Sequence, residues 1–314
     1  MQQPRQTLDM NNMLHGSTPS ISVIIPSYQR HEEVIRAVKS ALSQTLPPCE
    51  IIVSNDGPDP EKGRLLAGLQ DDRIKYVEAP RRKNASATRN FGVRHAKGEW
   101  IALLDDDDIW LPEKLELQFR KLQQAGEPAA ILAGVERVYD QSGKTWCRPK
   151  GCFQSGCSVH DVLFSGAGGV NTSTIMAPAW AFRGYPFNED AERHEDWEWL
   201  LESGQKLPLL VTPEVICERH LKPGEGLSRP GGYEYTKDWY VRNRCLMPAD
   251  AQGRFISTIL SRKAAYDRMY RALPWMFAEM RWTSSISFYN IGRLLMPWII
   301  PSRARQGIRK LMSR

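Results

Sequence analysis

The sequence predicts an α/β fold in which a largely parallel sheet is flanked by helices. Apolar runs of strand length occur at 21–26, 50–55, 73–78 and 100–104. Segments with the apolar spacing of helices lie between these runs, and strands that alternate with helices are typical of βαβ units and parallel sheets. Polar residues follow three of the strands directly, which is where open α/β sheets bind their ligands.

The first strand is the run ISVIIP at 21–26, which its proline is expected to end. Glu32–Gln44 follows, with apolar residues on one helical stripe. The run EIIVSN at 50–55 is a second strand, and it leads into a turn at Asp56 and Gly57. These elements form the first βαβ unit.

The remaining units repeat the alternation. A short polar helix precedes a third strand at 73–78, and 85–96 is the next helix. Trp100–Leu104 is a wholly apolar strand, Pro112 is expected to open a helix at its first turn, and 129–139 is a fifth strand.

Four consecutive aspartates, Asp105–Asp108, follow the fourth strand. Neighbouring carboxylates repel one another and lose solvation on burial, so a positive group is expected among them. Mg²⁺ or Mn²⁺ prefers such oxygen ligands and shares its other positions with substrate phosphates. The alternative is a solvated acidic turn.

Polar residues at the ends of the first two strands strengthen the prediction of a ligand site. Ser27 and Tyr28 follow the first strand and Asp56 follows the second. Because parallel strands end at one edge, these residues and the aspartates are expected to form one site. The glycine patterns of dinucleotide-binding folds and of P-loop hydrolases are both absent.

The second half of the chain offers weaker signals. HEDWEWLL at 194–201 reads as a helix with an acidic start, and Glu195 and Asp196 could simply favour the helix dipole. His220 ends a strand-like segment, where a lone histidine is more often a surface or packing residue.

Charge is unevenly distributed. From Arg281 onward there are seven basic and no acidic residues, which leaves 35 basic against 36 acidic residues in the rest of the chain. A neutral body argues against nucleic acid as a partner. Phe288–Ile300 is apolar but interrupted, and with the basic residues after it this segment is expected to lie on an anionic membrane. The alternatives are a helix packed on the body and a dimer contact.

Three parts are therefore expected. Residues 1–19 form a flexible leader without the pattern of a signal peptide, 20–225 form the α/β domain, and 226–314 form a helical, basic and aromatic extension.

Four segments, taken together, resemble the inverting family 2 glycosyltransferases of the GT-A fold. They are ISVIIPSYQR, IIVSNDG, ATRNFGVRHAKGEWIALLDDDD and HEDWEWLL, in family order. The resemblance covers about residues 20 to 225. It implies a Rossmann-like, mostly parallel central sheet with flanking helices, and the C-terminal helical extension lies outside it.

The resemblance also implies roles for individual residues. Asp196 matches the general base, Asp107 the metal ligand for Mn²⁺ or Mg²⁺, and His220 a late histidine that also binds the metal. Pro58 stands where the family usually has Ser or Thr, which tightens the turn and leaves Asp56 in place. The residues expected on the nucleotide are Pro26, Tyr28, Asp56, Arg89, Asp105 and Asp106.

The implied activity is transfer of a sugar from a nucleotide-sugar, by default a UDP-sugar, to the hydroxyl of a glycan or lipid-linked acceptor. The expected setting is assembly of bacterial surface polysaccharide or lipid-linked glycan in the cytoplasm, at the inner face of the membrane. Two alternatives are a sugar nucleotidyltransferase and a non-catalytic membrane-surface adaptor. The first lacks its usual glycine-rich loop here, because PSYQRHEE follows the first strand.

Overall fold

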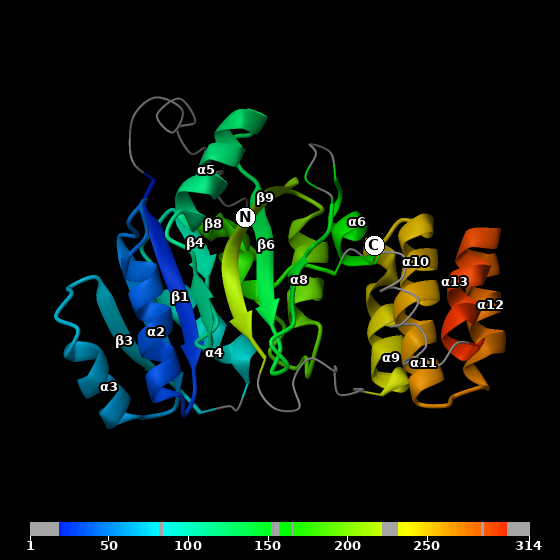
Figure 1. The fold of residues 1–314 in the computed structure, drawn as a ribbon, viewed down its shortest axis with the longest axis horizontal. Coiled ribbons are helices and arrows are strands. Elements are labelled where there is room, and N and C mark those ends of the chain that lie inside the picture. The colour runs from blue at the N-terminus through cyan, green and yellow to red at the C-terminus, as the bar shows by residue number, and fades with distance from the viewer. Residues whose placement is uncertain are drawn as a thin grey trace, which may run out of the picture. The chain divides into compact units, whose positions relative to one another are not determined.

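The computed structural model describes residues 19–81, 84–151, 153, 157–164, 166, 168–221, 232–283 and 286–299. The chain divides into two compact units (Figure 1). The sheet unit comprises residues 1–159 and 170–223, and the helical unit comprises residues 160–169 and 224–314.

The first half of the sheet unit is parallel, as predicted. Its strands are β1 (Ile21–Ser27), β2 (Glu50–Asp56), β3 (Ile74–Ala79) and β4 (Trp100–Leu103), and they lie in the order β3-β2-β1-β4. The proline at 26 does not end β1, contrary to expectation. The proline nitrogen points toward β4, but the pairing of β1 with β4 ends at Ile24 and Leu103. The missing N–H therefore removes no hydrogen bond between the two strands.

The second half of the sheet is mixed, and the described residues form nine strands in all. Antiparallel pairs join β4 to β8, β8 to β6, β6 to β7 and β5 to β9, whereas β6 and β9 are parallel. The bounds are β5 (Asp108–Trp110), β6 (Ile131–Tyr139), β7 (Thr145–Arg148), β8 (Met176–Pro178) and β9 (Leu209–His220). The two three-residue strands, β5 and β8, are too short for their periodicity to be read from the sequence.

The helices of the sheet unit are α2 (His31–Leu42), α3 (Pro60–Ala67), α4 (Ala85–His95), α5 (Lys114–Ala125), α7 (Ala179–Gly184) and α8 (Glu195–Ser203), with a 3₁₀ turn, η1 (Thr172–Thr174). The predicted stripe of α2 is buried at Val34, Val38 and Ala41, in one cluster with residues of β1 and β2. Helix α5 begins at Lys114, two residues later than Pro112.

Helix α4 packs closely on the sheet at Gly92. A Cβ added there would lie 2.7 Å from Cγ2 of Ile24 and 3.2 Å from Cβ of Ser54. The Ser54 hydroxyl also donates a hydrogen bond of 2.8 Å to the carbonyl of Thr88 on α4. The small residue therefore sets the distance between helix and sheet, and with it the position of every side chain that α4 carries.

We expect Gly92→Ala to lower the free energy of unfolding by about 1–3 kcal/mol, because the extra methyl group overpacks this contact. Urea unfolding followed by circular dichroism would measure the change. Gly184→Ala is the matched control, since a Cβ at that helical glycine meets nothing within 4 Å. Equal stability of the Gly92 variant and the control would contradict the assignment.

The helical unit contains α9 (Tyr233–Asn243), η2 (Arg244–Leu246), α10 (Ala249–Phe255), the π-helical segment η3 (Ile256–Leu260), α11 (Ser261–Tyr266), α12 (Ala272–Trp282) and α13 (Phe288–Ile299). Helix α6 (Val159–Phe164) begins at the last residue before this unit. The core of the helical unit holds Trp239, Tyr240, Phe255 and Met276, and the ring centroids of the stacked Tyr240 and Phe255 lie 5.3 Å apart. The predicted C-terminal helical region is therefore confirmed.

Two predicted segments lie largely outside the described residues. They are the leader, of which only Pro19 is described, and the last basic residues of the chain, Arg303, Arg305, Arg309, Lys310 and Arg314. Within the described ranges, no helix has both the length and the apolar character needed to cross a bilayer.

Candidate active site

Three strand ends meet at one edge of the sheet, as predicted. Strands β2, β1 and β4 are neighbours and parallel, so their C-terminal ends lie side by side (Figure 1). They carry Asp56, Ser27 with Tyr28, and the acidic run Asp105–Asp108 respectively. Asp56 is buried at its strand end, just before Gly57, whose φ of +98° suits glycine.

The acidic run is held by the protein's own arginines. Arg89 Nη2 lies 2.9 Å from Asp105 Oδ1. Arg30 Nη1 bridges the next two carboxylates, at 2.7 Å from Asp106 Oδ1 and 2.7 Å from Asp107 Oδ2. Asp106 is buried, whereas Asp105 and Asp107 remain partly exposed to the site. The expected positive groups are therefore present, and the run is not a solvated turn.

The last carboxylate of the run, Asp108, is buried inside the sheet. It accepts hydrogen bonds from Ser173 Oγ at 2.6 Å and Asn171 Nδ2 at 3.1 Å, and it lies opposite Arg219 in the β5–β9 pair. Burial, helped by the charges of Asp105 and Asp107, raises the pKa of Asp108 to about 8. This residue fixes the run to η1 and β9 and does not face the site's opening.

A buried lysine forms hydrogen bonds with residues at the ends of both β1 and β2. Lys62 of α3 is fully buried, and its Nζ donates to Ser27 Oγ at 2.8 Å and to Asn55 Oδ1 at 2.6 Å. Burial lowers the pKa of this ammonium group. Neither Lys62 nor Arg30 was identified from the sequence, because each contacts residues that lie far from it along the chain.

Arg89 connects the acidic run to the start of helix α8. Besides Asp105, its guanidinium approaches Glu195, with Nη1 4.0 Å from Oε1. Asp196 follows Glu195 in the first turn of α8 and is half-buried. Burial and the charge of Glu195 raise the pKa of Asp196 to about 7, and Arg89 opposes this shift. Carboxylates some 90 positions apart in the sequence therefore gather around one arginine.

Two predicted nucleotide residues lie at the β1 end. Tyr28 is half-buried beneath Arg81, whose guanidinium carbon lies 4.7 Å from the ring centroid and whose Nη2 donates to the phenol oxygen. Pro26 is buried within β1 and pairs with Ser54. Pro26 is therefore covered by the protein, whereas Tyr28, which follows β1, is partly exposed at the edge of the sheet.

The two predicted metal ligands lie at the same end of the antiparallel pair β5–β9. Asp107 immediately precedes β5 and His220 is the last residue of β9, so they follow the pair Asp108–Arg219 in register. The His220 ring stacks on Tyr139, with centroids 4.6 Å apart. In the described part of the chain, no group of three or more His, Cys, Asp or Glu side chains is arranged to hold a metal. One carboxylate and one imidazole would suit a divalent cation that substrate phosphates also coordinate.

An α/β unit of this topology, followed by a helical region, has the GT-A fold. The structure matches the crystal structure of S. aureus TarS 1–349 in complex with UDP-GlcNAc with a TM-score of 0.63. The match covers 93% of this chain and 92% of that chain, at 13% sequence identity. It confirms the predicted fold class.

Residues 22–170 match the family model described as Glycosyl transferase family 2. This segment contains the three strand ends, Arg89 and the whole acidic run. The family 2 match that the resemblance predicted is therefore confirmed over this segment.

Bacterial proteins named as glycosyltransferases or as polysaccharide biosynthesis proteins are similar to this chain. The putative colanic acid biosynthesis glycosyl transferase WcaA of Escherichia coli K12 is 26% identical over 67% of this chain and 75% of its own length. The UDP-Glc:alpha-D-GlcNAc-diphosphoundecaprenol beta-1,3-glucosyltransferase WfgD of Escherichia coli is 35% identical over 31% of this chain and 39% of its own length. The succinoglycan biosynthesis protein ExoO of Rhizobium meliloti is 29% identical over 39% of this chain and 35% of its own length, so the match covers about a third of that protein.

Proposed function

We propose that the sheet unit transfers a sugar from a nucleotide-sugar to an acceptor hydroxyl with inversion at the anomeric carbon. The observation that carries the proposal is the contact of Arg89 with Asp105 at 2.9 Å on one side and its approach to Glu195 at 4.0 Å on the other. This arrangement joins an acidic edge, suited to a nucleotide diphosphate that carries a divalent cation, to a helix start that holds a base of raised pKa, Asp196.

A UDP-sugar is the donor that we propose. The nucleotide would lie along the ends of β1, β2 and β4, against Tyr28, Asp56 and Asp105, with Pro26 beneath it and Asp106 and Arg89 behind the acidic edge. Two similar proteins support this choice by their names: TarS was crystallised with UDP-GlcNAc, and WfgD is named for UDP-Glc.

Asp196 would act as the general base. As the acceptor oxygen attacks the anomeric carbon, the carboxylate removes the hydroxyl proton, and the nucleoside diphosphate leaves from the opposite face. Positive charge develops at the anomeric carbon in such a reaction. A carboxyl group whose pKa lies about 7 suits this role, because it is ionised in a useful fraction at neutral pH and is more basic than an ordinary aspartate.

Asp107 and His220 would hold a divalent cation, Mn²⁺ or Mg²⁺, which when bound would neutralise charge on the leaving diphosphate. Arg30 already contacts Asp107 and Asp106. It would keep the two carboxylates in place and limit their mutual repulsion before the donor arrives.

The acceptor that we propose is a lipid-linked glycan of bacterial surface polysaccharide assembly, met in the cytoplasm at the inner face of the membrane. The names of three relatives support this choice. That of WfgD contains a diphosphoundecaprenol-linked GlcNAc, and those of WcaA and ExoO refer to the biosynthesis of colanic acid and succinoglycan.

A panel of nucleotide-sugars would test this function. The full chain is incubated with each donor in Mn²⁺, in Mg²⁺ and in a chelator, and release of the nucleoside diphosphate is measured. We expect hydrolysis of at least one UDP-sugar that depends on the cation. Release of pyrophosphate from a nucleoside triphosphate plus sugar phosphate would instead identify a nucleotidyltransferase.

A further inference from the structure

Helix α13 exposes apolar side chains along one face. Phe288, Tyr289, Met296 and Ile299 are 97%, 67%, 49% and 73% exposed. On a helix of 3.6 residues per turn these four positions, with Gly292, fall within about 100° of one another. A helix on the surface of a soluble domain normally turns polar residues outward on such a face.

The opposite face of α13 is the one that packs on the helical unit. Leu294 is fully buried, and its carbonyl accepts a hydrogen bond from Ser261 Oγ on α11. Trp298 Nε1 donates to the same hydroxyl oxygen at 3.0 Å. Because these contacts fix the rotation of the helix, the exposed apolar face is set by packing and cannot turn inward.

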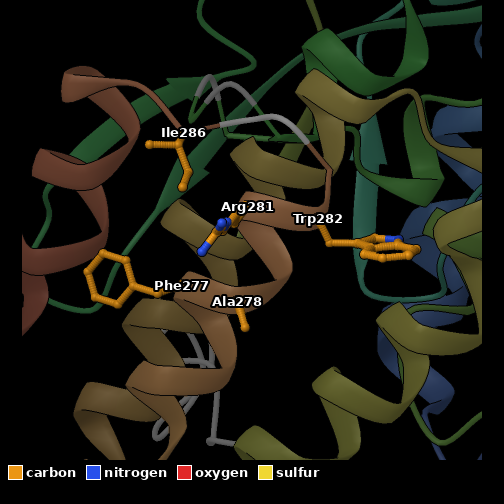
Figure 2. A pocket seen from close by; sticks show the side chains of 5 residues that line it. All are labelled: Phe277, Ala278, Arg281, Trp282 and Ile286. Carbon is orange, nitrogen blue, oxygen red and sulfur yellow. The ribbon is translucent and has the colours of Figure 1, made fainter.

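Two more exposed apolar side chains lie nearby in the sequence: Trp282, the last residue of α12, at 83%, and Ile286, two residues before α13, at 48%. Next to them is a hollow of about 560 Å³ lined by Phe277, Ala278, Arg281, Trp282 and Ile286 (Figure 2). Arg281 is the one charged residue of this lining, and in Figure 2 it lies between Phe277 and Trp282. We call the four exposed side chains of α13, Phe288, Tyr289, Met296 and Ile299, the apolar stripe.

The segment of the sequence that contains the apolar stripe carries charge of one sign. Glu279 is the last acidic residue of the sequence, and seven arginines and lysines follow it. Arg293 lies on α13 itself and donates to the Tyr289 hydroxyl at 3.0 Å. A second copy of this chain would bring the same positive charge against the stripe, which disfavours self-association. Anionic lipid headgroups complement the charge, and Trp and Tyr rings favour the interface between headgroups and acyl chains.

We propose that the apolar stripe docks into the interfacial region of an anionic lipid bilayer, with α13 lying in the membrane plane. The aromatic and aliphatic side chains enter the boundary of the acyl chains, and Arg281 and Arg293 meet lipid phosphates. Docking does not depend on the sugar-transfer chemistry, so the Asp196→Asn chain should bind vesicles as the unchanged chain does.

Co-sedimentation of the full chain with vesicles tests the proposal. One vesicle is phosphatidylcholine alone, and the other contains phosphatidylglycerol as well. We expect stronger binding to the anionic vesicle, weakened by salt. The triple variant Phe288→Ser, Met296→Ser, Ile299→Ser should lower the partition coefficient by about tenfold or more, because it removes three apolar side chains from the bilayer.

Val241→Ser is the matched control, since Val241 lies on α9 of the same unit and is 42% exposed. It should bind vesicles as the unchanged chain does. Circular dichroism of the triple variant should match the unchanged chain, because the three side chains are exposed. Equal vesicle binding by the triple variant would overturn the proposal. So would light scattering that shows a dimer of the unchanged chain and a monomer of the triple variant, because the stripe would then serve a second copy.

Discussion

Asp196→Asn is expected to reduce sugar transfer by about 10²–10⁴-fold while UDP affinity stays unchanged. The amide has the shape of the carboxylate but cannot accept the acceptor's proton at neutral pH. Asp196 lies in the first turn of α8, where its Oδ1 accepts a hydrogen bond from the backbone N–H of Trp197, and among the described residues no hydrogen bond joins it to the acidic run. Transfer rates and UDP titration of the same samples would therefore separate catalysis from binding.

The pH profile gives a second measure of the same residue. Since the base acts when ionised, and burial with Glu195 raises the pKa of Asp196 to about 7, kcat/KM should fall as the pH drops below about 7. Well below pH 7, kcat/KM should fall about tenfold per pH unit. The residual activity of Asp196→Asn should not show this fall. Glu202→Gln, an acidic position in the last turn of α8, is the control. Turnover retained in Asp196→Asn would reject Asp196 as the base.

The edge of the sheet was predictable because its strands are continuous apolar runs. Trp100–Leu103 is wholly buried, and a chain that buries such a run must expose or neutralise the aspartates that follow it. The parallel order of β2, β1 and β4 then follows from the alternation with helices. For this reason the positions of Tyr28, Asp56 and Asp105 on one edge could be inferred from the residues alone.

The partners of these residues were not predictable in the same way. Arg30 and Lys62 are single cations on polar segments, and nothing in their local pattern identifies the carboxylates or hydroxyls that they reach. Asn171 and Ser173 bind Asp108 from a segment without helical or strand periodicity. Such contacts depend on the tertiary fold, so a pattern within a short window does not contain them.

The start of α8 is a segment whose sequence alone does not identify a functional residue. The segment HEDWEWLL permits a simple capped helix, and only the resemblance gave Asp196 a chemical role. The structure adds a physical reason to look there, namely a half-buried carboxyl of raised pKa beside a carboxylate that approaches Arg89. Perturbed carboxyl groups of this kind gather at functional sites.

Asp107→Asn is expected to abolish the dependence of UDP affinity on Mn²⁺. In the unchanged chain, UDP should bind at least about tenfold more tightly with Mn²⁺ than with a chelator, because a hard cation held by one carboxylate completes its coordination with phosphate oxygens. An amide is a poorer ligand than a carboxylate for such a cation and carries no charge. Calorimetric titration of UDP in Mn²⁺ and in chelator measures the difference without relying on turnover.

The variant also tests the part played by Arg30. This guanidinium lies 2.7 Å from both Asp106 and Asp107, so removing one carboxylate leaves it paired with the other, and the fold should survive. Asp71→Asn is the matched control, because Asp71 forms a 2.7 Å ion pair with Arg73 beyond the other end of β3. If Asp107→Asn kept the Mn²⁺ dependence of the unchanged chain, the cation would have to be held elsewhere. Asp107 would then serve only to position Arg30.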